Sequence, residues 1–351
     1  MNILIVKTSA IGDVTHTLPA LNALRCRFPK AHISWLVEEA SADILKGHPA
    51  LDRVLVCKRK QWIGDFSKSF SVINMFKEVW NFVKLIRDTE YDLVLDFQGL
   101  LKSSIWVLLS RGKRKVGFGP GMDHAEHSYM FLNERVPAVS MDLHAVDREL
   151  MLLSSLGIAC SNIEFGIPVG DSDRQEVKRL LQSYLISEND NIVTINPMAA
   201  WETKLWQNRK FAQVADRLCQ KGFKVCFTGA GGDHDEIENI RSRMTCCSAV
   251  NLAGKTTLKT LAALYERSKF LLTTDTGPMH IAAAINTPVV ALFGPTAPRR
   301  TGPYGKRHTI VGVKVECSPC FKRFCPTTVC MQEITVNMVM HHIERILETD
   351  V

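Results

Sequence analysis

The segment 270–284, FLLTTDTGPMHIAAA, joins an apolar run to small residues at helical spacing through a short polar loop. This is the pattern of a buried parallel strand followed by its crossover helix, with a proline suited to the first helical turn. Short β-like runs alternate with helical patterns along the rest of the chain. The alternation predicts an α/β protein with parallel sheets built from β-α-β units.

Two sets of strands divide the chain. The predicted strands are 2–6, 32–37, 53–57, 92–96 and 115–118 in the first half, and 191–195, 224–227, 250–252, 270–273 and 288–293 in the second half. A single hydrophobic core rarely grows beyond about 250–300 residues, so 351 residues with two strand sets indicate two domains. We predict domains over 1–168 and 169–333, followed by an amphipathic helical segment over 334–351.

Helices are predicted between the strands. The longest helical pattern covers 69–88, where apolar residues recur at spacings of three and four: Val72, Ile73, Phe76, Val79, Trp80 and Val83. After the first strand, Leu18, Leu21 and Leu24 mark the inner face of another helix. Ligands of such sheets collect beyond the carboxyl ends of the strands, so chemistry is expected in the loops that follow them.

Composition and charge narrow the class of protein. Hydrophobic residues make up 46% of the chain, and no segment approaches the about 20 apolar residues that span a bilayer. The start, MNILIVK, has the pattern of a buried strand and not of a signal peptide, which favours a cytoplasmic protein. The net charge of +7 is gathered in clusters such as 58–60 and 111–115, which attract anions. Because these clusters lack interleaved aromatic residues, nucleic-acid binding is not expected.

The loop after the first strand, KTSAIGDVTHT, carries candidates for acid–base chemistry. It lacks the G-x-G-x-x-G spacing of a dinucleotide fold, which argues against a nicotinamide dehydrogenase. Asp13 is either an acid that complements the dipole of the following helix or a general base at the carboxyl end of the strand. Ser9 and His16 stand in the polar rim around it, and a structural, hydrogen-bonded role is the alternative for His16.

The loop quoted at the start has the features of a phosphate site. Pro278 suits the first turn of a helix that begins near Gly277, and the exposed amides and positive dipole end of that helix favour an anion. Thr276 and His280 can donate hydrogen bonds to a phosphate, whereas Asp275 is expected to support the loop or to accept from a sugar hydroxyl. A helix merely capped by Asp or Thr is the simpler alternative.

Three further loops follow strands of the second half. FGPTAP places Thr296 beside the loop just described, and the two together look like a nucleotide diphosphate site. Lys204 follows the first of these strands and either neutralises a departing phosphate or lies on the surface. GAGGDHD, which begins at Gly229 and includes Asp233, resembles a base or ribose pocket, with a metal-binding carboxylate pair as the alternative.

Seven stretches together resemble the heptosyltransferase family of inverting glycosyltransferases, which build the inner core of bacterial lipopolysaccharide from ADP-heptose. In chain order they are ILIVKTSAIGDVTHTLPAL, WLVEE, LVLDFQGLLKS, HAVDR, TKLWQNRKF, TDTGPMHIAAA and ALFGPT. Each is weak alone, but their order and spacing are specific and cover essentially the whole chain. The first two look most like heptosyltransferase I members, which add the first heptose to the Kdo sugar of Kdo-lipid A.

The resemblance implies a GT-B fold, in which two Rossmann-like domains face an interdomain cleft and the C-terminal helix crosses back to the N-terminal domain. The catalytic and donor-binding positions of the family fall on Asp13 as general base, on Lys204, Thr276, Gly277 and His280 as contacts of the ADP diphosphate, and on Asp275 near the donor sugar. One carboxylate suffices for inversion because the acceptor attacks opposite the leaving group. Cations and a helix N-terminus can replace a metal, so no cofactor is expected.

The acceptor side of the prediction draws on the basic clusters. Lys60, Lys102 and Arg114, together with Ser9 and His16, are predicted to bind the acceptor and its phosphates and carboxylates. The predicted reaction transfers heptose from ADP-heptose to Kdo-lipid A, carried out by a monomer bound peripherally to the cytoplasmic face of the inner membrane. The alternatives are heptosyltransferase II activity on a heptosylated core, another nucleotide sugar, or a non-catalytic nucleotide-sugar or metal-binding protein.

One motif departs from the heptosyltransferase I pattern. CSPCFKRFCPTTVC places Cys317, Cys320, Cys325 and Cys330 at C-x2-C-x4-C-x4-C, close to a motif of heptosyltransferase II relatives. Four thiols at this spacing could hold zinc or an iron–sulfur cluster. Tetrahedral sites more often use two C-x2-C pairs, so we interpret the segment as a reduced, ordered loop and predict no metal.

Overall fold

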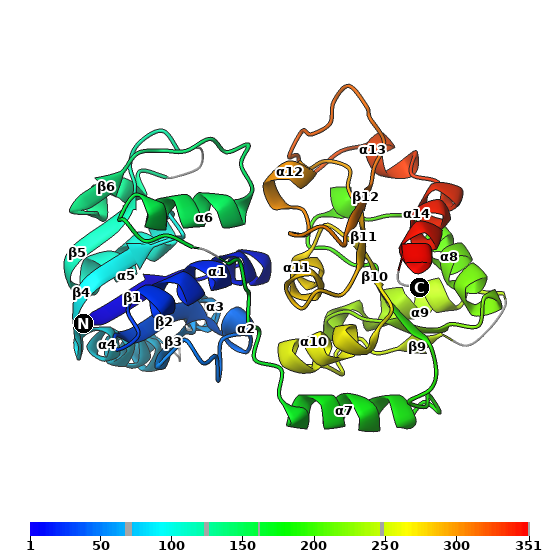
Figure 1. Ribbon diagram of the computed structural model, residues 1–351, viewed down its shortest axis with the longest axis horizontal. Coiled ribbons are helices and arrows are strands. Elements are labelled where there is room, and N and C mark those ends of the chain that lie inside the picture. The colour runs from blue at the N-terminus through cyan, green and yellow to red at the C-terminus, as the bar shows by residue number, and fades with distance from the viewer. Residues whose placement is uncertain (67–71, 123–125, 161, 246–248, 350–351) are drawn as a thin grey trace. The chain divides into compact units, whose positions relative to one another are not determined.

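The computed structural model describes residues 1–66, 72–122, 126–160, 162–245 and 249–349. Contacts divide the chain into two compact units, Met1–Pro168 and Val169–Val351 (Figure 1). Each unit contains one six-stranded sheet whose neighbouring strands are all parallel. The predicted α/β class with two parallel sheets is therefore confirmed.

The first unit is built on the sheet β3-β2-β1-β4-β5-β6. Its strands are β1 (Asn2–Val6), β2 (His32–Glu38), β3 (Arg53–Cys57), β4 (Glu90–Asp96), β5 (Arg111–Phe118) and β6 (Glu134–Val136). Its helices are α1 (Ile11–Arg27), α2 (Glu39–Ala42), α3 (Arg59–Phe66), α4 (Val72–Arg87), α5 (Leu101–Leu109), the 3-10 helix η1 (Ser128–Phe131) and α6 (Ala145–Ser154).

The second unit is built on the sheet β12-β11-β10-β7-β8-β9. Its strands are β7 (Ile192–Asn196), β8 (Lys224–Phe227), β9 (Val250–Asn251), β10 (Leu271–Thr274), β11 (Val289–Leu292) and β12 (Thr309–Val311). Its helices are α7 (Asp171–Gln182), η2 (Glu202–Lys204), α8 (Asn208–Gln220), η3 (Gly231–Asp233), α9 (His234–Arg241), α10 (Leu258–Arg267), α11 (Gly277–Ala284), α12 (Pro298–Thr301), α13 (Val329–Gln332) and α14 (Val336–Thr349).

Both sheets have the same strand order. Counted from its own first strand, each runs 3-2-1-4-5-6, the order of a Rossmann fold. The central strands are near-continuous apolar runs, as a parallel sheet covered on both faces requires. In β1, for example, Ile3, Leu4, Ile5 and Val6 have no exposed surface, and the predicted inner face of α1 is buried as well. Each of the two units is therefore Rossmann-like.

The strands differ from the sequence prediction in two respects: the outermost strands were missed, and several boundaries are shifted, most of all that of β5. The edge strands β6 and β12 were not predicted, because each has only three residues and its hydrophobic pattern is too short to stand out. Strand β5 begins at Arg111 and not at 115, since the basic cluster is itself part of the strand. Residues 69–71 of the predicted helix 69–88 lie outside the described residues, and the rest of that helix is α4.

Helix α4 has apolar residues on two opposite faces. Met75, Phe82 and Ile86 face inward and pack in the core of the first unit. Ile73, Phe76 and Trp80 point outward instead, with 84%, 61% and 61% of their surface exposed. The predicted apolar stripe therefore mixed the two faces, because periodicity alone cannot tell a buried apolar face from an exposed one. Among the described residues no helix has the length and hydrophobicity to span a bilayer.

Helix α14 packs within the second unit. Its residues Val339, Met340 and Ile343 are buried with Phe211 of α8 and Val311 of β12. Its apolar face is thus already covered by the second sheet and α8. The segment 334–349 therefore groups with the second unit, and a crossing of this helix back to the first domain stays a prediction; residues 350–351 lie outside the described residues.

Two glycines let the loops after β8 and β9 approach closely. A Cβ atom added to Gly254 would lie 2.7 Å from the Cα of Gly231, and Gly254 has a φ of +70°. The amide of Gly254 also donates to the carbonyl of Gly229 at 2.9 Å. Any side chain at Gly254 would therefore force the two loops apart and strain the backbone.

We predict that Gly254→Ala lowers the free energy of unfolding of the second unit by more than the about 1 kcal/mol that a positive φ alone costs. Gly222→Ala is the matched control, because Gly222 has a φ of +87° and open space around it. Denaturant unfolding of both variants measures the difference. Equal losses would show that the contact between the loops is not limiting.

Candidate active site

The strand order creates one switch point in each sheet. Crossovers leave in opposite directions on the two sides of the β1–β4 pair and of the β7–β10 pair, so the loops after these strands diverge and leave room for a ligand. The predicted chemical residues fall largely on these loops. Each switch point is described within its own unit.

In the first unit, Gln98 ties the two diverging loops together. Its Oε1 accepts from the amides of Thr8 and Ser9, each at 3.0 Å, and from the Thr8 hydroxyl at 3.1 Å. Gln98 follows β4, whereas Thr8 and Ser9 follow β1. Sequence reasoning missed this role, although a glutamine between a buried strand and a glycine was a visible signal.

Asp13 lies on the first turn of α1, beside these loops. Its Oδ2 accepts from the amide of Ala10 at 2.9 Å, so Asp13 caps its own helix. The half-buried side chain also lines a cavity of about 200 Å³, with Gln98, Arg148 and Glu149 among its other walls. The capping bond uses one carboxylate oxygen, and both expected roles are therefore compatible.

A buried ion pair forms the floor of this cavity. The Lys7 ammonium donates to Glu149 Oε1 at 2.7 Å and to the Phe97 carbonyl at 3.0 Å. Burial opposes the charge of Lys7, but the carboxylates of Glu149 and Asp13 together outweigh burial and raise the pKa of Lys7. The second oxygen of Glu149 has no hydrogen-bond partner among the described residues. This pair was not predicted, because it joins segments 142 residues apart.

Asp96, the last residue of β4, has a supporting role. Its Oδ1 accepts from the amides of Gln98 and Gly99, each at 3.0 Å. Burial raises its pKa to about 6 despite these donors. Asp96 therefore shapes the turn that presents Gln98, and the more exposed Asp13 is the carboxylate available to a substrate.

Two of the predicted acceptor residues, Ser9 and Lys102, are in contact, and a third, Lys60, lies at the same edge of the sheet. Lys102 of α5 donates to the Ser9 hydroxyl, and burial lowers the pKa of this lysine. Lys60 is exposed on α3, which begins at the carboxyl end of β3. Ser9 lies in the loop after β1, and α5 and α3 follow β4 and β3, so all three residues lie at the same edge of the sheet.

Two further predicted acceptor residues have protein partners of their own in the first unit, and their acceptor role stays a prediction. His16 has only 2% of its surface exposed, and its ring lies edge-on against His144, 5.1 Å between centroids. The ring therefore packs α1 against the start of α6. Arg114 lies inside β5 opposite Leu93, and its guanidinium makes a two-point pair with Glu134 at 2.8 Å. Arg111 and Lys113 each form an ion pair with an acid of β4, whereas Lys115 donates to the carbonyl of Leu108.

In the second unit, Asp275 connects three loops. Its Oδ2 accepts from Lys204 Nζ and from the Thr296 hydroxyl, each at 2.7 Å. Lys204 follows β7, Asp275 follows β10 and Thr296 follows β11. Asp275 and Thr296 are buried, and the ammonium of Lys204 lies 4.5 Å from the ring centre of Trp201. The cluster fixes a lysine at the second switch point.

Helix α11 begins next to this cluster. Thr276 is its N-cap in an extended conformation, Gly277 starts the helix, and Pro278 occupies its first turn. His280 is buried on that turn, with 7% of its surface exposed. The first amides of a helix and its dipole attract a phosphate. The predicted phosphate loop is thus a strand–loop–helix junction within reach of a lysine.

The loop after β8 is held by Asp233. Its Oδ2 accepts from the Ala230 amide at 2.7 Å, which is a capping arrangement. A Cβ atom on Gly229 would lie 3.0 Å from Asp233 and from Ile237, so this turn is closely packed. The side chain of Asp235 lies against His234 at 3.1 Å. Helix capping accounts for the D-x-D spacing. The loops after β8 and β9 touch each other at the carboxyl-end edge of the second sheet.

The four cysteines of the C-x2-C-x4-C-x4-C motif lie on a segment that supports the β11 loop. The amides of Cys320 and Phe321 donate to the Pro295 carbonyl at 3.0 and 2.8 Å, and the Thr203 hydroxyl donates to the Lys322 carbonyl at 2.8 Å. Burial raises the pKa of the Cys330 thiol. Within the described residues, no three Cys, His, Asp or Glu side chains are grouped to hold a metal ion.

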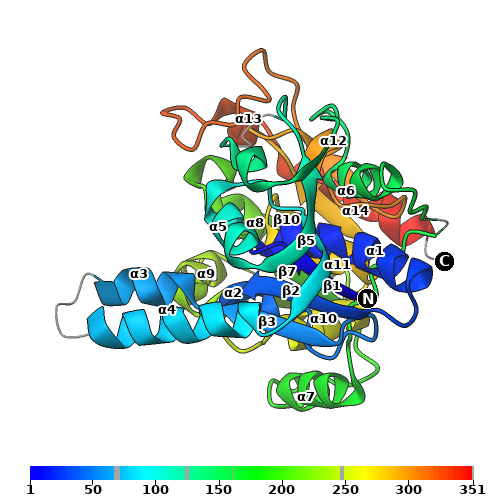
Figure 2. The same cartoon turned by 90° about the vertical axis from the view of Figure 1, so that its left-hand side faces the viewer.

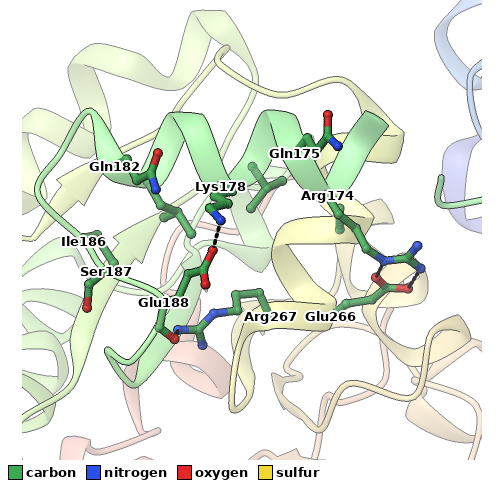
Figure 3. Close-up of a pocket in the computed structure, with 12 residues that line it drawn as sticks. Arg174, Gln175, Lys178, Gln182, Ile186, Ser187, Glu188, Glu266 and Arg267 are labelled. Carbon is green, nitrogen blue, oxygen red and sulfur yellow. Dashed lines mark hydrogen bonds and ion pairs between the residues drawn. The ribbon is translucent and has the colours of Figure 1, made fainter. Parts of the chain in front are cut away.

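A larger cavity than the one beside Asp13 lies elsewhere. It measures about 520 Å³ between α7 and α10, and its charged side chains pair with one another, as Arg174 does with Glu266 and Lys178 with Glu188 (Figure 3). Arg267, also in its wall, precedes β10. The cavity therefore lies at the amino ends of the strands, away from both diverging loops, and we do not assign the active site to it.

Comparison with known proteins points to one family. The family model of glycosyltransferase family 9 (heptosyltransferase) matches residues 79–330. Lipopolysaccharide heptosyltransferase 1 of Pseudomonas aeruginosa is 31% identical, with 93% of this chain and 87% of that protein covered. The Escherichia coli K12 protein of the same description is 28% identical, with 88% and 93% covered.

Solved structures agree with this result. E. coli heptosyltransferase WaaC with ADP-2-deoxy-2-fluoro heptose is 25% identical and superposes with a TM-score of 0.75, with 98% of this chain and 99% of that chain covered. E. coli ADP-heptose lps heptosyltransferase II is 20% identical with a TM-score of 0.78 and shows the same fold. The family model covers the loops of both Gln98 and Lys204, and the P. aeruginosa protein extends the likeness to nearly the whole chain. The chain therefore belongs to glycosyltransferase family 9, the heptosyltransferases.

Proposed function

We propose that the protein transfers heptose from ADP-heptose to the Kdo residue of Kdo-lipid A, with inversion at the anomeric carbon. The observation that carries the proposal is the division of chemistry between the two switch points. The first presents an accessible carboxylate, Asp13, and the second presents Lys204 beside the N-terminus of α11. The WaaC complex with a fluorinated ADP-heptose supports the donor, and the P. aeruginosa relative supports an acceptor in lipopolysaccharide.

Asp13 is the general base of this mechanism. The acceptor hydroxyl gives its proton to a carboxylate oxygen of Asp13 while its own oxygen forms a bond to the anomeric carbon. The bond from that carbon to the β-phosphate oxygen breaks, and ADP leaves with the electron pair. The Ala10 amide holds one oxygen of Asp13 and fixes the side chain. Gln98 and the Lys7–Glu149 pair keep the surrounding loops in place.

The departing diphosphate is stabilised by groups of the second unit. Lys204, the Thr276 hydroxyl, the first amides of α11 and His280 supply positive charge and hydrogen-bond donors. Asp275 and Thr296 hold the Lys204 side chain in its direction, and Asp275 also offers an acceptor to the donor sugar. Gly229 and Asp233 belong to the wall that receives the nucleoside. These groups need no metal ion, and we propose that none is required.

The acceptor is bound at the edge of the first sheet. Ser9 and Lys102 touch each other there, and Lys60 stands on α3 at the same edge. We propose that the ammonium groups of Lys102 and Lys60 bind the acidic groups of Kdo-lipid A. We also propose that the protein acts as a monomer bound peripherally to the cytoplasmic face of the inner membrane. An acceptor that already carries one heptose is the alternative that the four-cysteine motif favours.

ADP release by the purified protein tests the acceptor. With ADP-heptose and deacylated Kdo-lipid A, we expect turnover that EDTA does not remove. The same acceptor already bearing one heptose should give at least ten-fold lower turnover, because a site built for Kdo would leave polar groups unpaired. The opposite preference would assign the protein to addition of the second heptose, and no release with either would remove the proposed donor or acceptor.

For the general base, we predict that Asp13→Ala and Asp13→Asn both lower kcat by about 10²–10⁴-fold. ADP affinity should change less than about two-fold, because Asp13 lies outside the second unit. Asparagine keeps an oxygen for the Ala10 amide but accepts no proton. Recovery of turnover in Asp13→Asn would show that capping, and not proton transfer, is the role of this residue.

For the diphosphate site, we predict that Lys204→Met weakens ADP binding by about 10- to 100-fold, the effect of losing a charged hydrogen bond. Thr296→Val, which keeps the shape of the side chain, should weaken it by less because Thr296 acts through Asp275. Titration calorimetry measures both. Lys221→Met, an exposed lysine paired with Glu344 in the same unit, is the control; ADP affinity unchanged in Lys204→Met would contradict the assignment.

A further inference from the structure

Helix α4 carries an outward face of unusual composition for a water-exposed surface. Ile73, Lys77, Trp80, Lys84 and Arg87 follow one another at spacings of four and three, which places them on one side of a helix. Phe76 lies beside this row. The apolar members are the exposed Ile73, Phe76 and Trp80, and the three basic members are exposed as well. We call these six residues the α4 outer face.

The acidic residues next to this face, Glu78 and Asp88, are both engaged by partners on other elements. Glu78 accepts from Trp62 Nε1 at 2.9 Å, on the side where α4 meets α3. Asp88 lies just beyond the helix and makes a two-point pair with Arg53 at 2.8 and 2.9 Å. Within residues 73–87 the outward row thus combines aromatic and aliphatic groups with positive charge only.

The aromatic and basic groups of the face are in contact. The Lys84 ammonium lies 5.8 Å from the ring centre of Trp80, within reach of a cation–π interaction. A hollow of about 480 Å³ adjoins them, walled by Trp80, Val83, Lys84, Arg87, Asp88 and Leu109. On the neighbouring α5, Ile105 and Leu108 are also half-exposed. The apolar surface therefore extends beyond a single side chain, which is uncommon without a binding partner.

The α4 outer face belongs to an arm that begins at the acceptor edge. Strand β3 ends at Cys57, and α3 starts at Arg59 with Lys60. Helices α3 and α4 then run side by side, and their far ends point away from the strands of the first sheet (Figure 2). A surface on this arm is thus connected through one helix to the region of Ser9, Asp13 and Lys102.

We propose that the α4 outer face docks the first unit on an anionic lipid bilayer. Interfacial helices bury aromatic and aliphatic residues at the boundary of headgroups and acyl chains while their basic residues meet anionic headgroups. Trp80 and Phe76 supply the apolar contact, and Lys77, Lys84 and Arg87 bind lipid phosphates. The proposal rests on the proposed function only in that a lipid-borne acceptor gives the docking its purpose.

Vesicle flotation of the full-length protein tests the docking. We use vesicles of phosphatidylethanolamine and phosphatidylglycerol at 3:1 and, for comparison, phosphatidylcholine alone. Phe76→Ser/Trp80→Ser should bind anionic vesicles at least about ten-fold more weakly than the unaltered protein. Lys77→Gln/Lys84→Gln should also lose affinity, and its binding should depend less on salt. Leu185→Ser is the control, because Leu185 is 92% exposed in the second unit.

A second readout separates docking from catalysis. Phe76→Ser/Trp80→Ser should transfer heptose normally to a deacylated, water-soluble acceptor and at least about ten-fold more slowly to the same acceptor in vesicles. Absence of transfer by every form of the protein would count against the proposed function and leave the flotation result standing. Failure of the unaltered protein to float, or equal binding by all variants, would overturn the docking. Conversion of a dimer to a monomer by Phe76→Ser/Trp80→Ser would overturn it too, since the face would then bind a second copy.

Discussion

The burial of both faces of each parallel sheet is the constraint on which the rest of the structure depends. Parallel strands need a crossover for every connection, and the crossovers must cover the apolar surface on either side. In the order 3-2-1-4-5-6, the coverage changes side between the first and fourth strands. The loops after these strands therefore diverge, and polar residues can occupy the gap without breaking the core. Gln98 does so in the first unit, and Asp275 in the second.

The two units use the same position for different chemistry. At the first switch point, the buried Lys7–Glu149 pair and the bonds from loop amides to Asp96 hold the loops in place. Asp13 remains as the accessible carboxylate. At the second, a lysine is held by a buried carboxylate next to the start of a helix. The cysteine-rich segment adds support from outside, through the carbonyl of Pro295 and the hydroxyl of Thr203. Its thiols thus belong to a loop that shapes the phosphate site.

The parts that sequence could predict are those fixed by local pattern. Strands β1, β3 and β8 were predicted to the residue, because each is a short apolar run between polar turns. The positions of Asp13 and of the Thr276–His280 loop followed from their place after strands. The contact of Lys204 with Asp275 could not follow, because it requires β7 and β10 to be neighbours although their first paired residues, Thr194 and Leu271, lie far apart in the chain.

The errors have equally specific causes. The strand was predicted to begin at Lys115, but the basic cluster 111–115 already forms the start of β5, to which β6 pairs only from Val116 onward. Basic side chains are tolerated on such an unpaired edge and find acidic partners on β4. Helix α4 has apolar residues on a buried face and on an exposed face, and both sets recur at the helical period. The sequence therefore predicts the helix, but it does not show which of its apolar residues are exposed.

Hydrogen–deuterium exchange with and without ADP tests the central claim, that the two switch points bind different substrates, most directly. We expect slower exchange in the loops around Lys204, Gly229, Thr276 and Thr296 when ADP is added, with no change around Ser9 and Asp13. Slower exchange around Asp13, or in the cavity between α7 and α10, would contradict the assignment of the nucleotide to the second switch point.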